Sequence, residues 1–420
     1  MINVNEIRKY LEKKNLKFWK ISESDGFKSE IYTIFDDIES SRSFVSKSFT
    51  VSLAIDHDKY TGNSTFSISP TLSISEMEKT IDKGMKAASL VKNQYYPIEQ
   101  KIFAYPKIEN VEEKMDDFFV KVREAMDGVK GVKFCSSELI LSHGMGSFIN
   151  SFGNTLEHRG QSTTLDMVFL TEDEKYESQF LRFARSIDEL QIKETVEKYS
   201  KFAQDSQKAK TLKTGRYNVL FTEEVLEELF TFFLCHASGS AFHNKYSSFK
   251  KGERVFKEGN GTPLYITSDP TLKGREVIVD RFGNPLKKFS IIENSELVNI
   301  VADVRYAHYL KESFTGPLSN VVIGCGKKSY NDLAMEEGTL IIPRVSAFSP
   351  KEITGDLAGE IRLGYLVKNG ELHPVKGGSF SGNLKDLMPD ALFSKEEFRI
   401  NGYIGPRGIK MNGVNIAGGE

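Results

Sequence analysis

Residues that could bind a metal gather in one stretch of the chain, TEEVLEELFTFFLCHASGSAFHNKYSSF, residues 222–249. It contains Cys235, His236 and His243, and thiolate and imidazole groups are common protein ligands of zinc. Adjacent side chains on a helix point about 100° apart, so Cys235 and His236 would not converge. Two helical turns would separate His236 from His243 by roughly 10 Å, unless the chain turns at Gly239. Because a catalytic zinc needs about three protein ligands, these residues alone are a weak candidate site.

Two other short motifs contain a nucleophile. Residues 377–382 read G-G-S-F-S-G, which matches the G-x-S-x-G pattern of serine hydrolases. The flanking sequence lacks the strand before the serine and the helix after it, so we expect a glycine-rich connection. Lys327 could activate the nearby thiol of Cys325, but the segment G-C-G-K-K-S has the spacing of a turn rather than of a phosphate-binding loop.

The stretch at 222–249 also contains the element that would position such groups. Apolar residues are distributed almost all round a helix over 223–236, which predicts that this helix is buried. Thr222 is a candidate N-cap, and the glutamates that follow it would lie where the helix dipole favours negative charge.

Composition and charge exclude several classes of protein. The chain has 420 residues, 56 Lys and Arg against 58 Asp and Glu, and a net charge of −2, so we expect no nucleic-acid partner. No apolar run reaches membrane-spanning length, and the charged N-terminus has no apolar signal segment, so we expect no membrane association. The three cysteines, Cys135, Cys235 and Cys325, are widely spaced, which favours free thiols and a cytoplasmic location.

The order of predicted elements indicates an α+β protein in three segments. Residues 1–100 are predicted to form an N-terminal α+β domain with helices on a small sheet. Residues 101–210 form a middle α+β segment, and residues 211–420 a strand-rich domain of mainly antiparallel sheet with one buried helix. The helices expected before residue 210 are 3–16, 73–91, 111–126 and 186–202, and the main strands are 30–35, 49–55, 64–69, 133–141, 146–150 and 162–170.

The C-terminal half resembles the TldD/PmbA family, which was named for modulation of DNA gyrase and is related to metallopeptidases. The resemblance covers most of 130–420 and depends on the order of several short segments rather than on any one of them. These segments are Asn150-Ser151-x-Gly153, GRYNVLFT at 215–222, Lys245-x-Ser247-Ser248-Phe249, Asp269-Pro270, Asp280–Pro285, Ser319-Asn320, Gly355-Asp356, Asn369-Gly370-Glu371, Pro374–Gly377 and Gly382–Asp386.

Active members of this family carry H-E-x-x-x-H on the helix and a cysteine in a C-terminal G-x-C-G-K segment. Counting back from Ser247-Ser248-Phe249 places Thr231 at the first histidine, Phe232 at the glutamate and His236 at the second histidine. Ile404 occupies the place of the cysteine. The sequence therefore resembles the PmbA (TldE)-like branch, which lacks the metal motif, and we expect neither a metal site nor a catalytic residue in this chain.

The resemblance implies a cytosolic complex that acts on unfolded peptides. A TldD-like subunit would carry the zinc in a heterodimer with this chain, although a homodimer is also compatible with the sequence. The N-terminal domains would help to enclose a substrate channel, for which His236, His243 and Asn320 are the candidate residues. Two alternatives stay open: a diverged zinc peptidase that uses His236, His243 or Cys235, and a homo-oligomeric peptide-binding or regulatory protein.

Overall fold

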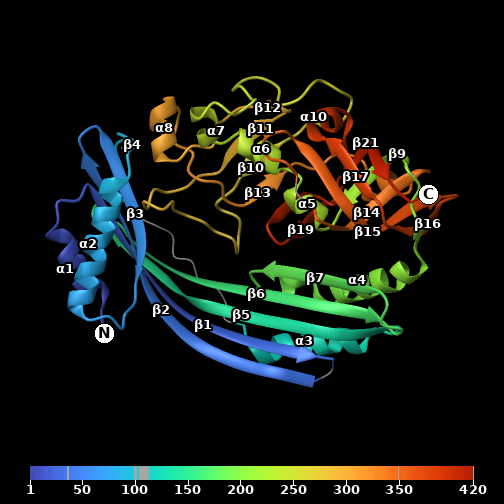
Figure 1. Ribbon diagram of the computed structural model, residues 1–420, viewed down its shortest axis with the longest axis horizontal. Helices are drawn as coiled ribbons and strands as arrows, with labels where there is room; N and C mark the ends of the chain where they lie inside the picture. The colour runs from blue at the N-terminus through green and yellow to red at the C-terminus, as the bar shows by residue number, and fades with distance from the viewer. Residues whose placement is uncertain (36, 99–101, 104–112, 349, 420) are drawn as a thin grey trace.

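The computed structural model describes residues 1–35, 37–98, 102–103, 113–348 and 350–419. A long curved sheet formed by the first half of the chain lies beneath a strand-rich C-terminal part (Figure 1). This α+β architecture, with a mainly antiparallel C-terminal part, confirms the fold class predicted from the sequence.

The N-terminal sheet has seven antiparallel strands in the order β4-β3-β2-β1-β5-β6-β7. It runs through the boundary expected near residue 100, because β1 pairs with β5 from Lys20↔Asn150 to Ile34↔Ser136. The strands are β1 Phe18–Ile34, β2 Asp37–His57, β3 Tyr60–Ile68, β4 Asn93–Gln94, β5 Val132–Asn150, β6 Thr155–Thr171 and β7 Glu177–Ala184. The expectation of a small sheet was wrong, because the strands are longer than predicted. In β1 and β2, for example, residues before 30 and before 49 continue the hydrogen-bonded pairing.

Helices cover the two ends of this sheet, where its apolar side chains are concentrated. At one end α1 and α2 pack on Trp19, Ile21 and Val51. At the other end α3 and α4 pack on Leu139, Leu165 and neighbouring residues. The elements are α1 Val4–Glu12, α2 Ile74–Leu90, α3 Met115–Asp127, the 3-10 turn η1 Asp188–Leu190, and α4 Ile192–Lys208. The first two residues of the helix expected at 111–126 lie outside the described residues.

A row of small residues lets the middle of the sheet bend. Ser46, Gly26, Gly144 and Gly160 lie side by side on four neighbouring strands. A Cβ atom on Gly144 would lie 2.5 Å from the carbonyl oxygen of Asp25, which no real side chain tolerates. Close approach of two strands therefore requires glycine at this point, and the curvature seen in Figure 1 follows.

The C-terminal part contains a six-stranded and an eight-stranded sheet. In the larger sheet the order is β14-β9-β21-β17-β15-β16-β8, and an additional β14–β15 pairing closes the first five of these strands into a ring. The strands of the larger sheet are β8 Lys210–Thr211, β9 Gly215–Thr222, β14 Thr339–Ser346, β15 Asp356–Lys368, β16 Glu371–Lys376, β17 Ser379–Asn383, β18 Leu392–Phe393 and β21 Gly408–Ala417. Those of the smaller sheet are β10 Ile266–Ser268, β11 Phe289–Glu293, β12 Glu296–Leu297, β13 Val321–Ile323, β19 Glu397–Ile400 and β20 Tyr403–Pro406.

Short helices connect these strands, and the continuous helix expected at 223–236 is wrong. Glu223 has a left-handed backbone (φ 58°), and Phe230 is non-helical (φ −97°, ψ 0°), so the segment is split into α5 and α6. Its burial was predicted correctly, because Val225, Leu229 and Phe232 are fully buried. The helices are α5 Val225–Glu228, α6 Thr231–His236, α7 Gly239–His243, α8 Val304–Leu310, α9 Tyr330–Ala334, α10 Leu384–Leu387 and the 3-10 turn η2 Met388–Asp390.

Candidate functional site

His236, the residue at a family ligand position, lies at the end of α6 and is only 1% exposed. The backbone N–H of Ser248 donates to its Nδ1 (2.9 Å), and its Nε2 donates to the carbonyl oxygen of Ile353 (2.9 Å). Burial lowers the pKa of His236, so the neutral imidazole that these bonds require is favoured. Both ring nitrogens are engaged within the protein, which leaves neither for a metal ion or a substrate.

Aromatic rings enclose this histidine. The ring centroids of Phe232 and Phe249 lie 4.6 Å and 5.0 Å from that of His236. Ser247 Oγ donates to the carbonyl oxygen of His236 (2.7 Å), while the backbone N–H of Phe249 donates to the same Oγ (3.1 Å). The Ser247-Ser248-Phe249 landmark thus wraps the end of α6 and fixes the histidine in a packed interior.

The other positions of the family's metal motif also hold residues that do not bind zinc. The hydroxyl of Thr231 donates to the carbonyl oxygen of Glu228 (2.8 Å), Phe232 is fully buried, and Ile404 is 1% exposed in β20. In the described parts of the chain no group of three or more His, Cys, Asp or Glu residues is arranged to hold a metal ion. The residues present at these positions therefore do not fit a catalytic zinc.

The remaining candidates do not converge on His236. His243 is exposed, and its ring packs on Tyr309 (centroids 4.9 Å apart) and Tyr306 (5.8 Å). Asn320 has a left-handed backbone (φ 39°), and its Nδ2 donates to the carbonyl oxygens of Asp269 (3.0 Å) and Arg275 (2.7 Å). The Asn320 side chain thus holds two loops together, and the His243 ring packs against tyrosines at the surface.

The cysteines and the G-x-S-x-G match also lack an activating environment. Burial, and then the Glu352 carboxylate, raises the pKa of Cys235. Partial burial of its sulfur, with Glu397 and Glu396 nearby, raises the pKa of Cys325, which opposes the activation by Lys327 considered above. The serines of G-S-F-S-G lie in β17, between β15 and β21, and not at a strand-to-helix turn.

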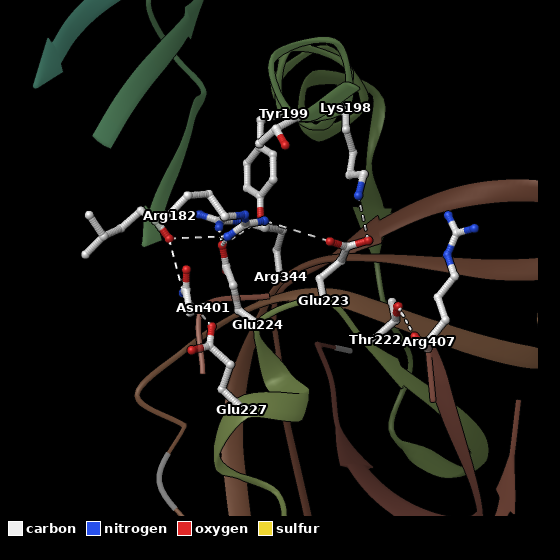
Figure 2. A network of polar contacts seen from close by, with 12 residues as sticks. Arg182, Lys198, Tyr199, Thr222, Glu223, Glu224, Glu227, Arg344, Asn401 and Arg407 are labelled. Atoms are coloured by element: carbon white, nitrogen blue, oxygen red, sulfur yellow. Dashed lines mark hydrogen bonds and ion pairs between the residues drawn. The ribbon is translucent and has the colours of Figure 1, made fainter. Parts of the chain in front are cut away.

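A polar network that was not predicted joins the two halves of the molecule (Figure 2). The Glu224 carboxylate accepts hydrogen bonds from Tyr199 OH (2.5 Å), Arg344 Nη1 (2.7 Å) and Arg182 Nη1 (3.3 Å). Arg182 comes from β7 and Tyr199 from α4, whereas Glu224 and Arg344 belong to the C-terminal part. One carboxylate therefore binds donors from two elements of the N-terminal half and from one strand of its own half.

The neighbouring Glu223 belongs to the same network. Its Oε1 lies 2.9 Å from Lys198 Nζ and its Oε2 lies 3.9 Å from Arg182 Nη2, in a residue that is 4% exposed. Thr222 is not a helix N-cap as expected, because it ends β9 and its Oγ1 donates to the carbonyl oxygen of Arg407 (2.8 Å). Both glutamates therefore pair with cations of the N-terminal half, and the Glu224 side chain, at the N-cap position of α5, makes no capping hydrogen bond.

A second set of hydrogen bonds joins β7 to the C-terminal part, next to the network around Glu224. The backbone N–H of Phe183 in β7 donates to Asn401 Oδ1 (2.8 Å). Asn401 Nδ2 donates in turn to Glu227 Oε1 (2.9 Å), and both residues appear in Figure 2. Burial raises the pKa of Glu227 to about 7 despite the hydrogen bond from Asn401. The exposed edge of β7 is thereby tied to the turn between β19 and β20.

A cavity of about 340 Å³ lies between α4 and the C-terminal sheet next to this network. Its lining includes Lys198, Asp205, Glu223, Tyr365 and Arg407. Across it the hydroxyl of Tyr365 donates to Asp205 (2.8 Å). Charged and aromatic side chains of both halves thus meet in one seam, which sequence spacing could not reveal.

Known structures share this fold over nearly the whole chain. TldE from Thermococcus kodakarensis superposes with a TM-score of 0.81 at 19% identity and covers 98% of this chain and 99% of its own. A proposed modulator of DNA gyrase from Bacteroides thetaiotaomicron gives 0.81 at 17% identity over 99% and 98% of the two chains. A similarly described protein from Thermotoga maritima gives 0.80 at 19% identity over 98% and 99%.

Sequence comparison adds the family. The uncharacterized protein MJ0231 of Methanocaldococcus jannaschii is 27% identical over 192 residues, which span 42% of this chain and less than half (45%) of that protein. No helix within the described ranges has the length and apolar character needed to cross a membrane. Residues 214–418 match the family model described as the PmbA/TldA metallopeptidase C-terminal domain. The chain therefore carries the C-terminal domain of the PmbA/TldA metallopeptidase family at residues 214–418, and it shares the fold of TldE over nearly its whole length.

Proposed function

We propose that this chain is the metal-free subunit of a TldD/PmbA-type peptidase complex that acts on unfolded peptides. The observation that carries the proposal is the filling of the metal motif by side chains that cannot bind zinc. Thr231, Phe232 and Ile404 stand at the ligand and acid positions, and the two ring nitrogens of His236 bind Ser248 and Ile353.

The catalytic zinc then belongs to a second, metal-bearing subunit of the same family. Supporting this role, the fold matches that of TldE along almost the full chain. The network around Glu224 keeps the C-terminal part fixed on the N-terminal sheet, so this subunit would present a rigid wall to the partner. His243, which is exposed, is the channel candidate with an accessible side chain, whereas His236 and Asn320 would support the wall from inside.

A diverged zinc peptidase is less well supported. It would require His236 to break two hydrogen bonds and leave its aromatic surroundings, and His243 packs against a different pair of rings. A cytosolic location accords with the three free thiols at Cys135, Cys235 and Cys325.

The test is reconstitution. The purified chain, a metal-bearing TldD-like subunit and their mixture are assayed on an unfolded polypeptide such as reduced, alkylated casein. We expect no hydrolysis by this chain, and hydrolysis by the mixture that exceeds that of the other subunit alone. His243→Ala, with Lys311→Ala as an exposed control, tests the channel wall. Hydrolysis by this chain alone that is lost in His236→Ala would overturn the proposal.

A further inference from the structure

The first part of β2 is an open strand edge. Residues 37–48 pair with β1 on one side, whereas β3 pairs with β2 only from Phe49 to His57. No other described strand adjoins this free side of residues 37–48. All twelve residues are exposed, which means that both faces of the strand as well as its edge meet solvent.

This edge carries charged side chains at Asp37, Glu39, Arg42 and Lys47, but it lacks most other features that protect sheet edges from pairing. It contains no proline, and its single irregularity is the bulge that leaves Glu39 without a partner on β1. Large apolar side chains are exposed along it, with Ile38 at 52%, Phe44 at 45% and Val45 at 73%. Long exposed edges of this kind pair with other strands unless they are blocked. The edge is therefore suited to strand addition.

We infer that this edge pairs with the same edge of a second copy of the chain, antiparallel and with Ser43 facing Ser43. A two-fold axis perpendicular to the sheet joins identical edges and keeps each side chain on its own face. In this register Arg42 lies opposite Phe44 of the second copy, and the reverse pair repeats across the axis. Glu39 lies opposite Lys47 in the same way, so oppositely charged groups meet twice.

Neighbouring registers are less favourable. Moving the axis to Arg42 places two guanidinium groups opposite each other, and like charges in that position are destabilising. Moving it to Phe44 brings residues 37–39 of the second copy opposite residues 49–51, all of which already pair with β3. The axis at Ser43 pairs residues 38–48 of the two copies without a like-charge pair, and only Asp37, the first residue of β2, then lies opposite Phe49.

This inference is independent of the proposed function. The ribbon of β1 and β2 lies on the side of the sheet away from the C-terminal part (Figure 1). Pairing there leaves the surfaces around α6 and α7 free, so a metal-bearing partner could still bind each copy.

Cysteine cross-linking tests the register directly. In a chain carrying Cys325→Ser, which removes the exposed native thiol, Ser43→Cys is compared with Ser46→Cys under mild oxidation. Directly opposed residues have Cβ atoms close enough for a disulfide, so Ser43→Cys should form a covalent dimer. Ser46→Cys should not, because the two copies of that residue would lie about 20 Å apart along the strands. A mixture of Ser40→Cys and Ser46→Cys chains should cross-link, since these positions face each other.

Sedimentation equilibrium supplies a second readout. Glu39→Lys should weaken the dimer at least tenfold, while circular dichroism verifies that the variant is folded. Equal cross-linking of Ser43→Cys and Ser46→Cys, or of neither, would overturn the inference. It would also fail if Ser43→Cys cross-linked only to an added TldD-like subunit, or only to an unfolded cysteine-containing polypeptide.

Discussion

Replacing Glu224 by alanine should loosen the joint between the two halves of the molecule. Its carboxylate is the shared acceptor for Arg182, Tyr199 and Arg344, and these residues reach it from β7, α4 and β14. Without it, two guanidinium groups that are mostly withdrawn from water lose their main counter-charge. Arg182 would keep its hydrogen bond to Tyr199 OH (2.9 Å), but its nearest carboxylate would then be Glu223, whose Oε2 is 3.9 Å away.

The size of the effect follows from the burial of these groups. The Arg182 and Arg344 side chains are 9% and 18% exposed, and that of Glu224 is 26% exposed. Removing one partner of a buried ion pair costs roughly 3–5 kcal/mol, and partial exposure of Glu224 places the expected loss near the lower end, about 3 kcal/mol. Glu224→Gln, which keeps one acceptor oxygen, should lose about half as much.

Urea unfolding measures this loss with two probes. Trp19, the single tryptophan, is buried in β1 and reports the N-terminal sheet by fluorescence, while far-ultraviolet circular dichroism reports the whole chain. With a denaturant slope of about 3 kcal/mol per molar urea, the midpoint of Glu224→Ala should fall by about 1 M. Exposed Glu228 gives the matched control, and Glu228→Ala should shift stability by at most about 0.5 kcal/mol. Equal midpoints for the two variants would refute the view that Glu224 fastens the halves.

Three further predictions concern single ionisable groups. Because burial raises the folded-state pKa of Glu227 to about 7, its contribution to stability is fully present below the ordinary glutamate pKa and is lost as pH rises through 7. In Glu227→Gln the urea midpoint should therefore depend less on pH over that range. The pKa of His236 is lowered instead, so the free energy of unfolding should fall as pH drops below the ordinary histidine range. His236→Ala should cost about 2–4 kcal/mol by urea unfolding and should remove this pH dependence. Among the thiols, exposed Cys325 should react first with a thiol reagent in the native state. Because its pKa is raised, it should react more slowly at pH 8 than free cysteine. Faster reaction at Cys235 would contradict the partial burial of that residue.

The start of α2 can be read from local chemistry in the sequence. Ser73 caps α2 by accepting from the backbone N–H of Glu76, and the Glu76 side chain accepts from the backbone of Ser73 in return. Such caps depend on residues three positions apart, so they can be read from the chain directly. The first residues of the buried segment at 223–236 could not be predicted in this way, because Glu223 adopts a left-handed backbone and pairs with Lys198 and Arg182 of the N-terminal half.

Strand length was harder to predict than strand position. The predicted strand at 49–55 is the buried part of β2, where apolar and polar residues alternate. Its first twelve residues are polar or irregular in pattern and exposed, so no periodicity marked them, and pairing with β1 alone keeps them extended.

The sequence also predicted one part of the candidate site and not the other. Coordinated loss of the metal motif at Thr231, Phe232 and Ile404 could be counted from the Ser247-Ser248-Phe249 landmark. The network at Glu224 could not be predicted, because its partners Arg182 and Arg344 lie 42 and 120 residues away. Two consecutive glutamates directly after the segment GRYNVLFT at 215–222 were the one sequence signal that could have pointed to it.

Zinc binding by the isolated, purified chain tests the central claim most directly. After equilibrium dialysis against buffered zinc, with the metal-bearing subunit as a positive control, metal content is measured by inductively coupled plasma mass spectrometry for the chain and for His236→Ala. We expect zinc well below one ion per chain and no difference between the two proteins. One tightly bound zinc per chain that disappears in His236→Ala would contradict it.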